Sequence, residues 1–150
     1  MDIQFSECDF FNLWIWLEFD TVPSQMEQQY IEEIFNSWFF LGKLGGFNAE
    51  NVQVQETGLD ISYLDYNQDA ADDTLMSVMH NMSEVQFQGT IARCWFDLGT
   101  TDAIALDVLI NTLKQFDKDY VAIRRVQIGG DSEEWPAPKD AQADFVNALN

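Results

Sequence analysis

Basic residues are scarce in this chain of 150 residues: seven lysines and arginines stand against 26 aspartates and glutamates, giving a formal net charge of −19. Nucleic acids and anionic membranes are bound through cationic side chains that neutralise phosphate groups, so the charge disfavours both as partners. A partner with a basic surface stays open, and the long-range field would accelerate its approach. The simpler interpretation is that the charge serves solubility.

Histidine and cysteine are nearly absent, which removes most metal and nucleophile chemistry. The single histidine, His80, excludes a two-histidine metal site; a neighbouring acid could make it a general base, but no nucleophile stands next to it. Cys8 and Cys94 show no CxxC spacing; a bridge between them stays open, but the apolar run around Cys94 favours a buried thiol in a reducing compartment. No GxSxG motif occurs. We predict no catalytic residue, no metal ligand and no cofactor, and expect a protein that is not an enzyme.

Long apolar runs are also missing. None approaches the ~18 residues of a membrane-spanning helix, and residues 1–4 lack the features of a signal peptide, so we expect a soluble, cytoplasmic protein. The chain is rich in bulky apolar residues: 47% of its residues are hydrophobic and 14% are aromatic, which is typical of a folded globular protein. The length suits one domain.

The acidic stretch at 65–73 partly resembles the calcium-binding loop of an EF-hand. Four of its side chains match ligand positions of that loop: Asp65, Asn67, Asp69 and Asp73. The glycine that the loop requires is replaced by Ala70, and its final glutamate by Met76. A solvated acidic loop is therefore the favoured interpretation.

Residues 10–19, which follow a short lead-in at 1–9, form the most strand-like stretch, because aromatic and aliphatic side chains dominate them. Alternation directs one set of side chains toward a core: Phe11, Leu13, Ile15, Leu17 and Phe19. The opposite face carries Asn12, Trp14, Trp16 and Glu18.

Residues 20–24 predict the start of a helix, with Pro23 near the first turn and with Ser24 and Glu27 spaced as a capping box. Two rows of apolar side chains then predict a broad buried stripe: Met26, Tyr30, Ile34 and Trp38, with Ile31, Phe35 and Phe39 beside them. Glycines at 42, 45 and 46 end the helix.

Alternation at 52–63 predicts one bent strand or two short ones. An insertion at about 65–83 holds the acidic loop and a short amphipathic helix through Leu75, Val78, Met79 and Met82. Residues 84–98 predict a long strand, in which a bulge at Gly89 would turn Ile91, Arg93 and Trp95 outward.

A second helix follows, capped by Thr100 or Thr101. Its buried side holds Leu106, Leu109, Ile110, Leu113 and Phe116. A strand at 120–128 closes the domain.

This order of elements is that of the ferredoxin-like β-α-β-β-α-β fold. We predict an α+β sandwich in which an antiparallel four-stranded sheet carries both helices on one face. Residues 1–130 make this single domain. Residues 131–150 form an acidic C-terminal extension, in which a short helix is open from 140 to 149.

The strand face that the helices leave uncovered is the candidate site. With Arg93 and Trp95 beside them, Trp14 and Trp16 make an aromatic, arginine-containing surface of the kind found at protein interfaces. We predict that these four residues bind a protein partner or a second copy of the chain. Two alternatives stay open: the insertion or the C-terminal extension covers this face, or the face holds a small ligand.

Two runs, NLWIWLEF at 12–19 and NSWFFLGKLGGFN at 36–48, resemble a family of uncharacterised proteins of cyanobacteria and plant chloroplasts, catalogued as a domain of unknown function. The resemblance implies the cyanobacterial cytoplasm or the plastid stroma and, by association, a photosynthesis-related accessory or assembly role. It supplies no catalytic residues. We therefore expect a non-enzymatic interaction module that binds through its aromatic sheet face; the alternative is a regulatory ferredoxin-like domain that binds a small ligand.

Overall fold

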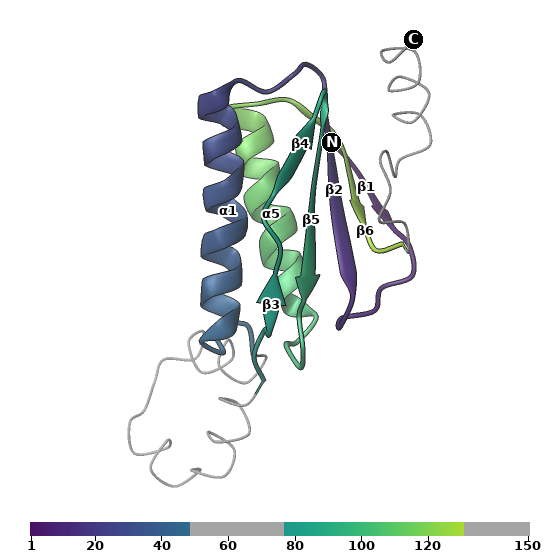
Figure 1. Ribbon diagram of the computed structural model, residues 1–150, viewed down its shortest axis with the longest axis vertical. Helices are drawn as coiled ribbons and strands as arrows, with labels where there is room; N and C mark the ends of the chain where they lie inside the picture. Colours follow the sequence, from purple (N-terminus) through teal and green to yellow (C-terminus); the bar gives the residue numbers. More distant parts are fainter. Residues whose placement is uncertain (49–76, 131–150) are drawn as a thin grey trace, which may run out of the picture.

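Residues 1–48 and 77–130 are the part of the chain that the computed structural model describes. They form a six-stranded sheet with both helices on one face (Figure 1). In chain order the elements are β1 (Asp2–Phe5), β2 (Leu13–Phe19), α1 (Gln25–Lys43), β3 (Asn81–Met82), β4 (Gln86–Gln88), β5 (Ile91–Asp97), α5 (Ile104–Asp119) and β6 (Ile123–Ile128). The fold is mixed α+β, as the sequence predicts.

The central strand is β2, which pairs antiparallel with β5 on one side and with β6 on the other. Its predicted inward face is confirmed for four residues, which are buried in the core: Leu13, Ile15, Leu17 and Phe19. The prediction is wrong for Phe11, which is 55% exposed because the strand begins only at Leu13. The Cα partners of Ile15 are Cys94 in β5 and Ile128 in β6, and both are also buried in that core. The opposite side of these strands, away from the helices, is called the outer sheet face below.

The start of α1 is also confirmed. The Ser24 hydroxyl accepts a hydrogen bond from the Glu27 backbone N–H (3.2 Å), and the Glu27 carboxylate accepts one from the Ser24 N–H (2.8 Å). This reciprocal capping box satisfies two N–H groups that a helix start otherwise leaves unpaired.

The buried stripe predicted for α1 is only partly right. Ile31, Phe35 and Trp38 are buried, and the Trp38 indole Nε1 donates to the carbonyl of Ala105 in α5 (2.9 Å). Met26 and Tyr30 were expected in the same stripe but are exposed. The sheet contacts the Ile31–Phe35 side of the helix, so positions about a third of a turn away face solvent.

The second helix, α5, has the buried side that the sequence predicts, formed by Leu106, Leu109, Ile110, Leu113 and Phe116. The predicted threonine cap is wrong: Ala103 stands at the N-cap and makes no side-chain bond. The carboxylate of Asp102 accepts from the Ile104 N–H instead (3.1 Å).

The sheet is mixed and not antiparallel, because β1 pairs parallel with β6 at one edge. The sequence interpretation treated residues 1–9 as a lead-in. β1 forms because Ile3, in register with Val126, is partly buried against the core and gains apolar contact there.

The single long strand with a bulge at Gly89 is also wrong. The chain reverses at 89–90 and forms a hairpin between β4 and β5, with Gln88 paired to Ile91. Gly89 has a φ of 58°, which suits the first central position of a two-residue hairpin turn. A turn with glycine in this place therefore competes successfully with a bulge.

Three predicted features lie outside the described residues: the strands at 52–63, the acidic loop at 65–73 and the helix at 140–149. At the end of the predicted insertion, residues 77–80 are not helical and β3 follows, so the expected amphipathic helix does not reach Met82. The last strand begins at Ile123 and not at residue 120. Within the described ranges, no helix is long and apolar enough to cross a membrane.

Candidate interaction surfaces

The outer sheet face brings all four predicted site residues together. Trp14 pairs with Trp95 and Trp16 with Arg93 across β2 and β5, and directly opposite residues of an antiparallel pair share a face. The Arg93 guanidinium carbon lies 4.8 Å from the ring centre of Trp14 and 5.4 Å from that of Trp16, within cation–π distance of both. The outward direction of Arg93 and Trp95 thus results from the hairpin, without a bulge.

Accessibility is uneven across this cluster. Trp16 is only 1% exposed, so a partner would gain almost no contact area from it. Trp14 and Trp95 are half-buried, and the Trp95 indole Nε1 donates to the Asn12 side-chain oxygen (2.7 Å). The Trp14 indole nitrogen is buried and has no hydrogen-bond partner among the described residues. The accessible part of the cluster is therefore its rim.

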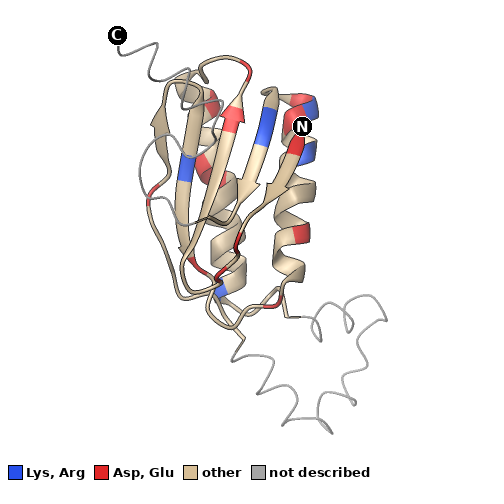
Figure 2. Cartoon of the chain, turned by 90° about the vertical axis from the view of Figure 1, so that its right-hand side faces the viewer, with Lys and Arg blue, Asp and Glu red and all other residues tan. Residues whose placement is uncertain are grey.

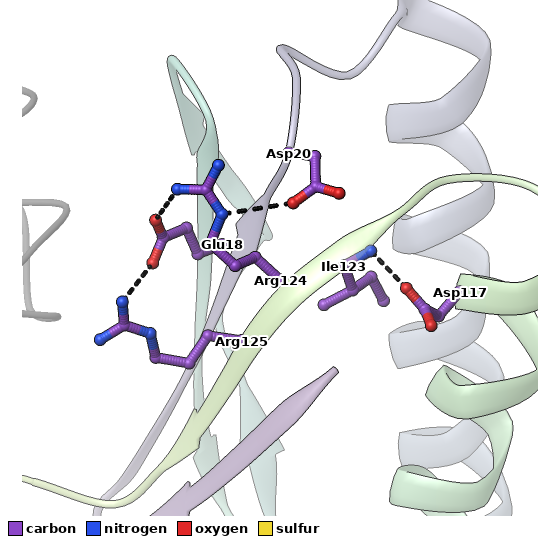
Figure 3. A network of polar contacts seen from close by, with 6 residues as sticks. All are labelled: Glu18, Asp20, Asp117, Ile123, Arg124 and Arg125. Carbon is purple, nitrogen blue, oxygen red and sulfur yellow. Dashed lines mark hydrogen bonds and ion pairs between the residues drawn. The ribbon is translucent and has the colours of Figure 1, made fainter.

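A buried acid lies beside this cluster. Glu18 is 1% exposed, and its two carboxylate oxygens approach Arg124 (3.2 Å) and Arg125 (3.1 Å), while Arg124 also contacts Asp20 (3.2 Å; Figure 3). The Glu18 oxygen nearest Arg125, Oε2, has no hydrogen-bond partner in the described part. Its contact with Arg125 is therefore an ion pair without hydrogen-bond geometry. The hydrogen bond with Asp20 and the charge of Glu18 raise the pKa of Arg124.

This network serves the fold, because a buried carboxylate is tolerated when cations compensate it. All three arginines of the chain lie on β5 and β6. Figure 2 views the sheet from the side opposite the helices, with basic segments on two strands and an acidic one between them. The alternating pattern predicted that Glu18 would lie on the outer sheet face, but it gave no sign of its two partners.

A second surface was not predicted. A groove of about 520 Å³ lies between α1 and α5 and opens to solvent. Trp38 and Phe116, both buried, form its floor, and its rim includes Leu41 on α1 and Tyr120 at the end of α5, which are 47% and 65% exposed. We call it the interhelical groove.

Most exposed apolar side chains of the described part lie along the two helices that form this groove, and four of them line it: Tyr30, Leu41, Val108 and Tyr120. Within residues 1–48 and 77–130, every exposed large hydrophobic side chain except Phe5 and Phe11 lies on α1, on α5 or within three residues of them: Val22, Met26, Tyr30, Phe40, Leu41, Leu44, Val108 and Tyr120. Scattered exposed hydrophobic residues are ordinary, but a contiguous group on one side of a molecule marks an interaction site.

The groove contains few polar groups. Glu33 is the one charged side chain among its described lining residues, and the ion pairs found in the described part do not include it. The rings of Tyr30 and Tyr120 meet at 5.4 Å between centroids, and Phe116 stacks on Tyr120 at 5.5 Å. The groove therefore presents aromatic rings and one carboxylate to a partner.

Within residues 1–48 and 77–130, the histidine and the two cysteines form no larger cluster of reactive side chains. His80 does pair with an acid, Asp97 (3.4 Å), and its ring lies 6.1 Å from that of Phe11. Cys8 and Cys94 are both free thiols, so the bridge left open by the sequence is absent, and burial raises the pKa of Cys94 to about 12. The part of the chain described by the structure holds no group of three or more side chains that could bind a metal.

No curated protein and no solved structure matches the chain. The sequence model of one family, described as a protein of unknown function (DUF3531), matches residues 1–143. This agrees with the resemblance inferred from residues 12–19 and 36–48, whereas an origin in cyanobacteria or chloroplasts stays a prediction. Because the match spans nearly the whole sequence, the chain belongs to the DUF3531 family of proteins of unknown function.

Proposed function

We propose that this chain is a non-enzymatic interaction module that binds a protein partner through the interhelical groove. The observation that carries the proposal is the gathering of exposed apolar side chains along α1 and α5. A buried large apolar side chain contributes about 1.5–3 kcal/mol relative to an exposed one. Covering the exposed parts of Leu41 and Tyr120 would therefore contribute about 2–3 kcal/mol before neighbouring side chains are counted.

The outer sheet face is the second candidate surface for the same function. The cation–π contacts of Arg93 and the unpartnered indole nitrogen of Trp14 favour it. The burial of Trp16 weighs against it, because the centre of a contact patch supplies most binding energy. A partner here would contact mainly Trp14, Arg93 and Trp95.

A small-ligand function is supported by one quantity, the groove volume of about 520 Å³, which falls within the usual range of ligand pockets. Such pockets add a few convergent polar groups, and two of the polar side chains lining the groove are already engaged. Thr112 donates to the Val108 carbonyl (2.8 Å), and Gln115 donates to Asp119 (2.5 Å). A protein partner therefore fits the groove better than a specific small ligand.

The ferredoxin-like arrangement expected from the sequence stays a proposal. The strand order β6-β2-β5-β3, with β4 also on β5 and both helices on one face, supports it, and β1 would then be an added edge strand. The photosynthesis-related accessory role and the stromal or cytoplasmic location come from the resemblance alone and stay predictions.

Comparative capture tests the proposed surface. Wild type, Leu41→Asp with Val108→Asp, and Phe5→Asp would each be immobilised and incubated with an extract of the native cells. Phe5 is the matched control, since it is 57% exposed, lies on β1 and does not line the groove. We expect one protein to be retained by wild type and Phe5→Asp but lost from the groove variant. Equal retention by all three would refute the groove as the contact surface.

The same extract tests the second surface through a Trp14→Ala/Trp95→Ala pair. Loss of the partner from this pair, with retention by the groove variant, would move the proposal to the outer sheet face. Circular dichroism of each variant separates loss of binding from loss of fold.

A further inference from the structure

We infer that the occupant of the interhelical groove is a basic amphipathic helix of the partner protein. This inference rests on the proposed function and specifies the chemistry of the partner. Its basis is the length of the apolar stripe, the two-helix walls of the groove, and the unpaired carboxylate of Glu33.

The length of the stripe favours a helix over a compact ligand. On α1, the groove lining runs from Tyr30 to Leu41. Exposed Met26 stands four positions before Tyr30 and exposed Leu44 three positions after Leu41, a spacing that puts side chains on the same side of a helix and so lengthens the stripe. At a rise of about 1.5 Å per residue, Met26 to Leu44 spans about 27 Å, or five helical turns. The groove lining on α5 runs from Val108 to the residue after its end, about 18 Å.

A third helix can pack in the space between two neighbouring helices. Side chains three and four positions apart form ridges on each helix, and a third helix packs its own ridge into the space between them. Recognition of this kind uses apolar anchors spaced i, i+3 or i+4, and i+7 on the bound helix. Three turns of such a helix would cover the floor formed by Trp38 and Phe116.

The carboxylate in the groove and the net charge of the chain both favour a positively charged partner segment. Glu33 faces the groove without an ion pair in the described part, so a lysine or arginine of the bound helix would meet both a carboxylate and the nearby faces of Tyr30 and Tyr120. The chain's net charge of −19 attracts a basic segment from a distance. Lys43, the basic residue at the end of α1, lies 5.8 Å over the ring of Phe39 and does not line the groove.

A second copy of the chain suits the groove less well. It would bring a second Glu33 and a second charge of −19 to the contact, and like charges at an interface oppose association. An anionic membrane surface is repelled for the same reason. A basic helix combines the apolar stripe that the groove can bury with the charge that it attracts.

Three fluorescein-labelled peptides of 18 residues test the inference. One carries a leucine stripe at helical spacing with lysine elsewhere, the second replaces each lysine by glutamate, and the third has the composition of the first in an order without a stripe. Binding would be measured by fluorescence anisotropy at about 0.15 M salt, where long-range attraction is screened beyond ~8 Å. We expect the striped basic peptide to bind at least about tenfold more tightly than either other peptide.

Matched variants locate the binding. Glu33→Gln and Glu32→Gln change the net charge equally, but only Glu33 lines the groove; Glu32 borders a separate hollow beside β3 and β4. Glu33→Gln should weaken the striped basic peptide about threefold or more and Glu32→Gln less than twofold, since an exposed ion pair is worth a few-fold in affinity. Leu41→Asn should weaken it further by removing apolar contact at the rim.

Each outcome decides the inference. Equal effects of the two glutamine variants, or equal binding of the ordered and disordered basic peptides, would assign binding to net charge and overturn it. Equal binding of the basic and acidic striped peptides, weakened by Leu41→Asn, would overturn the charge preference but leave the proposed interaction surface intact. A dimer in sedimentation that Leu41→Asn dissociates would assign the groove to a second copy instead. Failure of the proposed function itself shows separately, as equal partner capture by the groove variant.

Discussion

Gly99 provides a demanding test of how the end of β5 is packed. A Cβ at this position would lie 2.5 Å from the backbone carbonyl oxygen of Val78 and 2.7 Å from the imidazole of His80. The neighbouring backbone is fixed as well: the Thr100 N–H donates to the Val78 carbonyl (3.3 Å), and the Thr100 hydroxyl accepts from the Val78 N–H (3.2 Å). A methyl group therefore cannot be accommodated by a side-chain rotation alone.

The loss of folding free energy expected for Gly99→Ala has a backbone part and a steric part, and a second glycine, Gly89, allows the two to be separated. Gly99 has a φ of 56°, a region that costs an L-residue about 1–2 kcal/mol. Gly89 has nearly the same φ, 58°, but lies in the exposed hairpin turn. Gly89→Ala should therefore cost about 1 kcal/mol, whereas Gly99→Ala adds the displacement of the Val78 carbonyl, for a total of about 3 kcal/mol.

Urea denaturation followed by circular dichroism measures both variants against wild type, with the slope of the free energy against urea checked for constancy. The quantity that matters is the difference between the two free-energy changes, about 2 kcal/mol. If Gly99→Ala destabilised the protein no more than Gly89→Ala, the close approach of Val78 to Gly99 would be refuted.

Three further predictions concern burial. Because burial raises the pKa of Cys94 to about 12 while Cys8 is exposed, Ellman's reagent at pH 8 should detect one thiol in the native protein and two in denaturant; two reactive native thiols would contradict the burial. Arg125→Met should destabilise the protein by about 2–4 kcal/mol in thermal or urea unfolding, because it leaves buried Glu18 less compensated, and a neutral effect would show that the pair is unimportant. Met26→Lys should change the free energy of unfolding by less than about 0.5 kcal/mol, and a loss above about 1.5 kcal/mol would restore the predicted burial of Met26.

Local patterns predicted the elements that a single stretch of sequence determines. Alternation at residues 10–19 predicted β2, which the structure places at Leu13–Phe19, and its inward face from Leu13 onward, and the spacing of Ser24 and Glu27 predicted the start of α1. Both depend on interactions within a few residues, so no knowledge of distant contacts was needed. The buried side of α5 was predictable for the same reason, since its apolar residues lie on one side of the helix and its polar residues on the opposite side.

Pairing between distant segments was not predictable in the same way. The parallel pairing of β1 depends on the edge that β6 presents, and nothing within residues 1–9 indicates that edge. At Gly89, a bulge and a hairpin both satisfy the alternation on either side, so the pattern alone could not choose. The four residues of the predicted site do share a face, although the burial of Trp16 lay beyond what alternation can predict.

The interhelical groove was missed because α1 carries apolar residues around most of its circumference. Periodicity then supports more than one stripe, and the contact with the sheet decides which residues are buried. The excess of apolar residues was itself a usable signal: Met26, Tyr30, Leu41 and Leu44 exceed what one buried stripe requires. In a two-layer fold, the sheet covers only one side of a helix. A helix that is apolar on two sides therefore leaves one apolar side available to a partner.

The acidity of the chain and its apolar groove have linked consequences. Exposed apolar surface on this scale favours self-association, whereas a net charge of −19 on every copy opposes it. Salt screens the repulsion between copies and the attraction of a basic partner alike, but leaves apolar contact nearly unchanged. Rising salt should therefore slow partner binding while it increases self-association, and groove variants should suppress the second effect. Under the proposed function, the charge would therefore do more than keep the chain soluble, because it would favour basic partners over further copies of the chain at the groove.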